Sequence, residues 1–543
     1  MIKVSGLKLR PGEDVKHLRD KITRALSLDR ICGGKVPQFE YKILRRSVDA
    51  RKRPDIFFVY TVCADLGRQL EDKILNTRNA AGAEYYEEKK YDPPGLKDPS
   101  GLSGITKPVI IGAGPCGLFC AYILTLAGIP PIVMDRGSDI DKRTETVLNF
   151  FETGILSPEC NVQFGEGGAG AFSDGKLNTS VKDRDGINRF ILETFVKFGA
   201  KEEIAYDAKP HIGTDELKRV IKNMRIFMEE NGAVFLFDTK MTGFCLTGER
   251  LGGIRTNDRD IMTDRAVMAI GHSARDTFEM LYEKNVKMVS KPFAVGLRLE
   301  HRQSLMNKSR YGTEYDKDLP PSDYKVTNRT KKGRNVYSFC MCPGGYVIDS
   351  SSEEGRLCIN GMSFSKRDGR NCNSAIVVAV DEKDYGEGVL AGMEYQRKIE
   401  ERAFALAEGK IPVLSLREFR SGNIRKDKEF GLEPCIMGRY EKADIRGVLD
   451  PEINEAIIES IDKWNESIEG FNDEDAVLSA VEARTSSPVR IIRNEAHESC
   501  IRGLYAAGEG AGYAGGIMSA AADGVRTAGK LLESYNKRDG NGI

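Results

Sequence analysis

Three closely spaced glycines have the residue types and spacing that bind a dinucleotide. Gly112, Gly114 and Gly117 form a GxGxxG pattern directly after the apolar run 108–111. We expect Gly112 to permit a tight turn, Gly114 to let the backbone approach a pyrophosphate, and Gly117 to let a helix pack on the preceding strand. Pro115 lies in the same turn, and the free N–H groups at the start of the following helix attract phosphate.

The elements after this turn have the order that a dinucleotide fold requires. A helical pattern ends at Gly128, and a second apolar run, 131–134, ends at Asp135. Asp135 lies 23 residues after Gly112, a spacing typical of a carboxylate that binds a ribose hydroxyl. We therefore predict that Asp135 and the adjacent Arg136 contact the cofactor.

A second glycine-rich turn at the far end of the chain separates FAD from NAD. The run 501–507 ends in Gly508 and Glu509, and Gly515 and Gly516 precede a helical pattern that starts at Ile517. FAD is longer than the unit that holds its adenosine, so a second, distant loop is needed for its ribityl chain and isoalloxazine ring. We expect Glu509 to accept a ribityl hydrogen bond and the helix start to face the flavin N1/O2 edge. The alternative is a packing loop that needs several glycines.

A third glycine-rich segment lies between these two turns. It is expected to let the backbone approach the flavin and its phosphates, the alternative being a purely structural loop. A buried strand, 266–270, is predicted to end at a further cofactor glycine, and no second GxGxxG follows it, which argues against a reductase with a separate NAD(P)H domain. The predicted contacts are Gly165, Gly167, Gly168, Ser173, Asp174, Lys176 and Gly271.

Five residues are candidates for catalysis. Cys340 and Cys342 flank one residue, and on a strand their sulfurs would share a face and could relay electrons; two small buried hydrophobes are the alternative. His211 and His301 lie near predicted glycine-rich or strand-end sites, and either could protonate a substrate as hydride arrives, although a structural role is the alternative for each. Glu300 ends a predicted strand beside His301.

Four arginines are candidates for binding an anion. Arg367 and Arg370 could hold a carboxylate or a phosphate, and solvent exposure is the equal alternative. Arg484 and Arg490 flank a Thr-Ser-Ser-Pro stretch and could neutralise the flavin or an anionic substrate.

The composition limits the class of protein. The 543 residues carry 81 Lys plus Arg and 81 Asp plus Glu, so no net charge draws the chain to nucleic acid or anionic lipid. The 12 cysteines form no CxxC pair and the 5 histidines show no HxH or HxxxH spacing, so we expect no metal site. No apolar run has membrane-spanning length and the first residues contain no signal core. We expect a cytoplasmic protein whose partner is a small-molecule substrate or electron acceptor, and the oligomeric state stays open.

The pattern of elements predicts an α/β protein with three domains. Residues 1–95 are expected to form a small α+β domain, with strands at 2–9, 38–44 and 55–64 and a basic connection at 45–53. Residues 105–290 and 485–543 are expected to form a discontinuous Rossmann-type FAD-binding domain with a parallel sheet and a β-meander crossover. An α+β substrate or cap domain, 291–484, is inserted between them, and a Pro- and Gly-rich linker follows the first domain at 91–104.

Several motifs together carry a resemblance to a known family. The chain resembles the Rossmann-type flavoproteins of the glutathione reductase and fumarate reductase class, and more closely the FAD-dependent dehydrogenases once labelled NAD(FAD)-utilising dehydrogenases. The motifs that carry it are 161–177, 211–215, 339–345, 484–490 and 508–524.

The resemblance implies an FAD-dependent oxidoreductase. Such an enzyme would transfer a hydride through a non-covalently bound flavin, with NAD(P)H as a transient donor and a substrate that the motifs do not identify. Two other functions stay open: an FAD-dependent RNA-modifying enzyme whose basic N-terminal segment grips RNA, and a flavin-binding sensor without turnover.

Overall fold

The computed structural model describes residues 1–76, 82–95, 106–179, 183–313, 315–425 and 427–538. It separates into two compact units: Met1–Tyr91 with Lys182–His211 and Leu305–Ser322, and Asp92–Val181 with Ile212–Ser304 and Asp323–Ile543. Two later segments thus belong with the N-terminal residues, and the predicted three-domain division stays a prediction. Most of the predicted linker lies outside the described residues.

The first unit is built on an antiparallel sheet with two helices packed on it. Leu18 and Ile22 of one helix and Ile74 of the other join the core formed by the sheet's inner face. The strand order is β2-β3-β1-β4, and the elements are β1 (Ile2–Leu9), β2 (Glu40–Asp49), β3 (Phe57–Asp65), β4 (Ala83–Tyr85), α1 (Leu18–Ala25), α2 (Leu28–Ile31), α3 (Arg68–Leu75) and α6 (Ile187–Lys197).

The predicted basic connection is partly a strand. β2 continues through Arg45 and Arg46 because these residues pair with Thr61 and Tyr60 of β3 after a bulge. Arg46 also binds the later segment 183–211: its backbone oxygen accepts from Ala208 N, and its guanidinium donates to Asp207 at 2.6 and 2.9 Å.

The second unit contains the expected Rossmann-type sheet. Five parallel strands have the order β24-β11-β5-β6-β7, and the predicted meander, β8-β9-β10, is present. Their bounds are β5 (Val109–Ile111), β6 (Ile132–Met134), β7 (Val234–Leu236), β8 (Met241–Thr247), β9 (Arg250–Thr256), β10 (Ile261–Met262), β11 (Ala266–Met268) and β24 (Leu504–Ala506).

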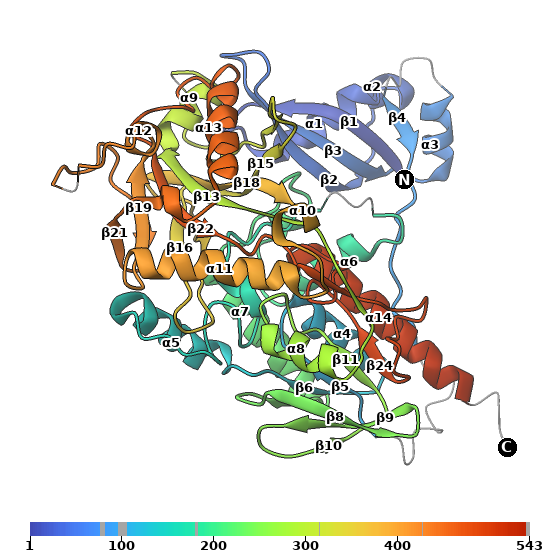
Figure 1. The fold of residues 1–543 in the computed structure, drawn as a ribbon. Coiled ribbons are helices and arrows are strands. Elements are labelled where there is room, and N and C mark those ends of the chain that lie inside the picture. Colours follow the sequence, from blue (N-terminus) through green and yellow to red (C-terminus); the bar gives the residue numbers. More distant parts are fainter. Residues whose placement is uncertain (77–81, 96–105, 180–182, 314, 426, 539–543) are drawn as a thin grey trace. The chain divides into compact units, whose positions relative to one another are not determined.

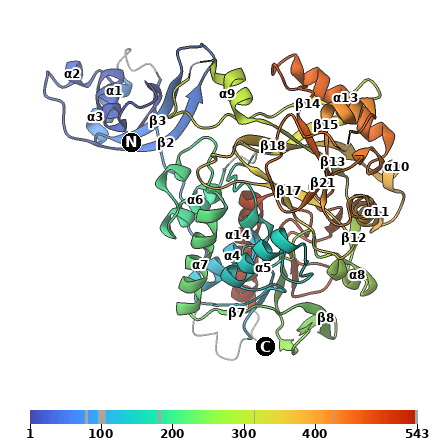
Figure 2. The ribbon, with the colours of Figure 1, turned by 90° about the vertical axis from the view of Figure 1, so that its left-hand side faces the viewer.

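The two faces of this sheet are covered by different elements. Val109 and Ile111 of β5 join one core with the meander, whereas Ile110 faces Gly117 on α4 (Pro115–Leu126). Every α4 residue from Cys116 to Thr125 is buried, because α14 (Ile517–Arg538) and α7 (Thr214–Glu230) also pack on this helix (Figures 1 and 2).

A second, larger sheet occupies the middle of the chain. Its seven strands have the order β14-β15-β18-β13-β22-β19-β21, and a small sheet, β17-β16-β20, lies beside it. The strands are β13 (Phe293–Arg302), β14 (Thr327–Arg329), β15 (Asn335–Cys342), β16 (Tyr346–Asp349), β17 (Ile359–Met362), β18 (Asn371–Val380), β19 (Ile411–Ser415), β20 (Ile436–Met437), β21 (Tyr440–Lys442) and β22 (Val477–Glu482).

A short two-stranded sheet, β12 (Met288–Ser290) with β23 (Val489–Ile491), lies where the chain enters and leaves this region. Among the described helices, none has both the length and the apolar character needed to cross a bilayer. The remaining helices are α5 (Ile140–Thr153), α8 (Arg275–Glu283), α9 (Gln303–Tyr311), α10 (Glu382–Tyr385), α11 (Ala391–Leu406), α12 (Leu416–Ser421) and α13 (Pro451–Asn465).

Candidate cofactor site

The GxGxxG segment forms a turn that only glycine can occupy. Gly112 has φ +105°, and a Cβ there would overlap the carbonyl oxygen of Ala269. A Cβ at Gly117 would overlap the carbonyl oxygen of Gly112, so the glycine lets α4 start close to β5. Gly114 caps α4 without a side-chain hydrogen bond and Pro115 follows in the first turn, which leaves the helix N–H groups available for an anion.

Asp135 lies at the end of β6, as predicted, but its oxygens already accept backbone hydrogen bonds. The buried carboxylate accepts from Ala113 N at 2.8 Å, Gly137 N at 2.9 Å and Gly165 N at 2.8 Å. Asp135 therefore ties the dinucleotide turn to the glycine-rich loop that starts at Gly165. Its predicted contact with a ribose stays a prediction.

Arg136 is held by two acidic side chains. It donates to both oxygens of Asp276, at 2.8 and 2.6 Å, and to Glu159 at 2.5 Å, and its guanidinium lies 4.4 Å from the centre of the Phe164 ring. Burial opposes ionisation of Asp276, but hydrogen bonds from Arg136 hold the pKa of this carboxyl well below its usual range. Arg136 thus orders the segment beside Asp135.

The glycine-rich loop packs against the start of two helices. Gly167 N donates to Ala113 O at 2.8 Å, and a Cβ on Gly168 would lie 3.0 Å from the Cα of Gly114. A Cβ on Gly170 would lie 3.1 Å from Cγ1 of Ile517, at the start of α14. The loop therefore contacts both the dinucleotide turn and the beginning of α14.

The C-terminal turn, around Gly508, also contacts the first turn of α4. A Cβ on Gly508 would lie 2.9 Å from the Cβ of Cys116, and Gly508 N donates to Asp523 at 2.7 Å. The two sequence-distant segments that FAD would need, around Gly114 and around Gly508, are thus neighbours in space.

Several features of this region fit an extended dinucleotide. Oε1 of Glu509 lies 3.4 Å from Nδ1 of His272, while the buried Nε2 of His272 has no hydrogen-bond partner within the described parts of the chain. A Cβ on Gly271, Gly515 or Gly516 would meet no atom within 4 Å. An uncapped helix start, an unpartnered ring nitrogen, a carboxylate and open glycines together match the phosphates and hydroxyls of FAD.

The end of the glycine-rich loop reaches a polar cluster near the large sheet. The carboxylate of Asp174 accepts from Ser363 Oγ and Arg367 Nη2, both at 2.6 Å, and lies 3.4 Å from Lys176 Nζ. Ser173 bonds within the loop, its Oγ donating to Gly170 O. Asp174 thus joins the loop to the segment 363–367, a partnership that the sequence did not indicate.

The two candidate redox cysteines do not share a face. A bulge interrupts β15 between Phe339 and Cys342, and Cys340 has φ +41°. Cys340 is exposed whereas Cys342 is buried, and both are free thiols. Desolvation by the surrounding protein raises the pKa of the Cys340 thiol to about 11 and that of the Cys342 thiol to about 12, so both thiols are protonated near neutrality. Their predicted redox role stays a prediction.

The other three catalytic candidates are Glu300, His301 and His211. Glu300 and His301 are buried in the large sheet: Glu300 accepts from Asn371 and Cys435, and His301 Nε2 lies 2.7 Å from Phe471 O. Burial raises the pKa of Glu300 to about 7 and lowers that of His301 to about 4. His211 is the last residue of its segment in the first unit. Catalysis by these three stays a prediction.

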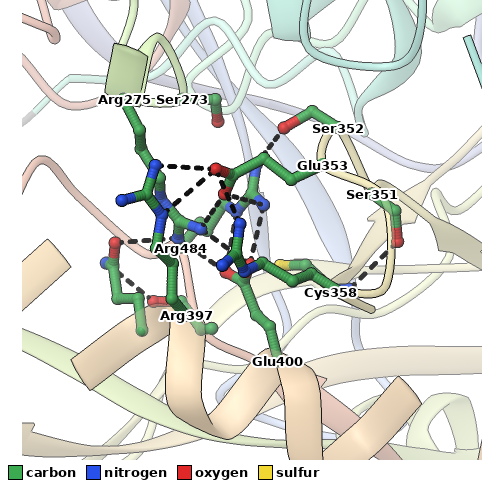
Figure 3. A network of polar contacts seen from close by, with 12 residues as sticks. Ser273, Arg275, Ser351, Ser352, Glu353, Cys358, Arg397, Glu400 and Arg484 are labelled. Atoms are coloured by element: carbon green, nitrogen blue, oxygen red, sulfur yellow. Dashed lines mark hydrogen bonds and ion pairs between the residues drawn. The ribbon is translucent and has the colours of Figure 1, made fainter. Parts of the chain in front are cut away.

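A buried ion network, which sequence reasoning missed, lies just after Gly271. Glu400 on α11 lies between two guanidiniums (Figure 3), accepting from Arg275 at 2.8 and 2.7 Å and from Arg484 twice at 2.8 Å. Arg484 was predicted to neutralise the flavin or a substrate, but its charge is directed to Glu400. Glu353 joins the network through Arg275 and Arg397.

The parallel sheet and the glycine-rich turn at its edge define a Rossmann-type dinucleotide-binding protein. Residues 292–485 match the family described as "FAD-dependent protein, C-terminal domain-like", and residues 1–64 match a domain of unknown function, DUF8436. The chain is 41% identical to an "Uncharacterized protein" of Clostridium beijerinckii over 542 residues, covering 98% of this chain and 99% of the relative, and it belongs to the same family.

Solved structures with a similar course of the chain are much more distant. L-proline dehydrogenase from P. horikoshii is 13% identical with a TM-score of 0.34, covering 79% of this chain and 94% of that one. E. coli quinol fumarate reductase FrdA is 12% identical with a TM-score of 0.36, covering 81% and 71%.

Proposed function

We propose that the protein is an FAD-dependent oxidoreductase that passes a hydride between a transiently bound NAD(P)H and a small-molecule acceptor, as in the NAD(FAD)-utilising dehydrogenases. The observation that carries the proposal is the meeting of three glycine-rich segments at the start of α4. The flavin, when bound, supplies the two-electron chemistry, accepting a hydride from a donor and giving it to an acceptor.

The chain's own residues would bind and orient this cofactor. The uncapped start of α4 would hold the pyrophosphate, and Asp135 keeps the turn and the glycine-rich loop in place for it. Glu509 would accept one hydroxyl hydrogen bond and His272 Nε2 would accept another, because the contact between Nδ1 and the Glu509 carboxylate places the ring proton on Nδ1.

An absorbance spectrum of the purified protein tests the proposal, followed by anaerobic titration with NADH and NADPH. We expect a flavin spectrum that one of the two nicotinamides bleaches. A colourless protein that cannot be reconstituted with FAD would exclude the function. A bound flavin that neither nicotinamide reduces would favour the alternative of a flavin-binding sensor without turnover.

The structure does not favour the RNA-modifying alternative. Arg46 is paired with Asp207, and Arg51 donates to both oxygens of Asp49 at 2.8 and 2.9 Å. These two cations of the basic segment are therefore directed to carboxylates of the protein itself.

A further inference from the structure

The polar cluster at the end of the glycine-rich loop holds two cations on one carboxylate oxygen. Oδ2 of Asp174 lies 2.6 Å from Arg367 Nη2 and 3.4 Å from Lys176 Nζ. Asp174 is buried, with 5% of its side chain exposed, whereas 28% of Lys176 and 15% of Arg367 remain accessible. Among the residues that the structure describes, two positive charges therefore share this carboxylate, and the cationic side chains are its accessible partners.

Arg367 carries one donor that is unpaired within the described part of the chain. Its Nε is buried and has no hydrogen-bond partner among the described residues. Leaving such a donor unpaired is costly, and a guanidinium favours bidentate pairing with a planar carboxylate.

The backbone holds Arg367 in an unfavourable conformation that directs its side chain to this place. Its φ is +49°, uncommon for a residue with a Cβ, and its N–H donates to Phe364 O. Gly344 allows this approach, since a Cβ there would overlap the carbonyl oxygen of Arg367. Strain of this kind persists where the surrounding structure enforces it and is common at ligand sites.

The nearby ionic pair does not neutralise the cluster. Arg298 on β13 donates to both oxygens of Glu482, at 3.0 and 3.1 Å, so that pair is balanced. Cys340 is exposed, and the charges of Lys176 and Arg298 act on its thiol. Cys340 is therefore an accessible reporter of the charge of Lys176.

We infer that Lys176 and Arg367 bind the carboxylate group of a substrate next to the flavin. A single carboxylate matches the surplus of one positive charge among the described residues of this cluster and can pair with the accessible parts of the Lys176 and Arg367 side chains. The loop that carries Lys176 also packs on Pro115 and Ile517 through Gly170, so such a substrate would lie along the same loop as the cofactor. This inference rests on the proposed function and adds a substrate class to it.

Alkylation of Cys340 in the intact protein tests the charge of this site. Iodoacetate and iodoacetamide both react with the thiolate, so the ratio of their rates at Cys340, read by peptide mass spectrometry, reports local charge and cancels the fraction ionised. We expect K176M to lower this ratio at least about threefold, as Coulomb interaction over several ångströms implies, and R367M to lower it in the same direction by removing the second cation on Asp174. Cys500, the other exposed cysteine, is the internal reference, and K366M, at the exposed neighbour of Arg367, is the matched control that should leave both ratios unchanged.

Protection by small anions identifies the ligand class. Acetate is expected to slow the reaction of Cys340 with iodoacetamide, and this protection should be lost in K176M and R367M. Unchanged rate ratios in both variants, or no protection by acetate, would overturn the inference. Stronger protection by inorganic phosphate would overturn the carboxylate assignment.

Labelling does not require a flavin, so its outcome is separate from the test of the proposed function. A colourless protein whose Cys340 still responds to both substitutions would keep the anion site and remove the oxidoreductase. A protein that binds flavin but whose Cys340 does not respond to the substitutions would keep the proposed oxidoreductase function and exclude the anion site.

Discussion

Glu400 offers the sharpest test of what stabilises the region after Gly271. Its carboxylate accepts four hydrogen bonds from Arg275 and Arg484, and all three side chains are buried (Figure 3). In E400Q the neutral amide cannot form an ion pair with either cation, so Arg484 loses its close counter-charge and Arg275 keeps only that of Glu353. Breaking a buried ion pair in this way typically costs about 3–5 kcal/mol.

The pKa of Glu400 reflects the same pairing with Arg275 and Arg484. Burial raises this pKa, but the charges of Arg275 and Arg484 outweigh burial and lower it from 4.5 to about 2. At about 1.36 kcal/mol per pKa unit, this lowering corresponds to about 3 kcal/mol. Because the folded-state pKa lies below the unfolded value, this stability is present above pH 4.5 and is lost as the pH falls toward about 2.

Thermal and urea unfolding of E400Q measure the loss, with E401Q as the matched control. Glu401, the next residue on α11, is half exposed and pairs with Arg356 at 2.8 Å, a surface pair worth about 0–1 kcal/mol. We expect a clearly lower unfolding midpoint for E400Q, a small change for E401Q, and a flatter pH dependence below pH 4.5 for E400Q. Equal midpoints for the two variants would refute the reasoning.

Three further outcomes are expected. G117A should purify with much less flavin, because a Cβ at this position overlaps the dinucleotide turn. The control G447A should keep its flavin, because a Cβ there meets no atom within 4 Å; flavin absorbance per mole of protein measures both. H272A should weaken FAD binding about twofold to tenfold through the loss of one hydrogen bond to a cofactor hydroxyl, measured by flavin fluorescence, and H17A at an exposed site should not. Because burial lowers the pKa of His301 to about 4, its ring proton signals in NMR should not shift between pH 5.5 and 8; titration near 6.5 would contradict this.

The dinucleotide turn could be predicted because its signal is local. Gly112, Gly114 and Gly117 lie within one turn and the start of one helix, and their spacing predicts which backbone atoms come close together. The parallel strands on either side are short apolar runs that the sequence also indicates. The parallel order β24-β11-β5-β6-β7 confirms this part of the prediction.

Predictions that depended on strand regularity were less successful. The two-residue period that would align Cys340 with Cys342 holds only in an uninterrupted strand, and the bulge in β15 removes it. The basic run after residue 44 looked like a connection because charge patterns do not show that Arg45 and Arg46 pair with β3.

The sequence by itself determined the cofactor fold: glycine spacing, apolar runs and the terminal acid of each run are properties of neighbouring residues. Only the tertiary structure decided which charges meet. Glu400 lies 125 residues from Arg275 and 84 from Arg484, and Asp174 lies 193 from Arg367. Residues so far apart in the chain come together through the order in which strands join a sheet and the course of the loops between them, and no local periodicity carries that information.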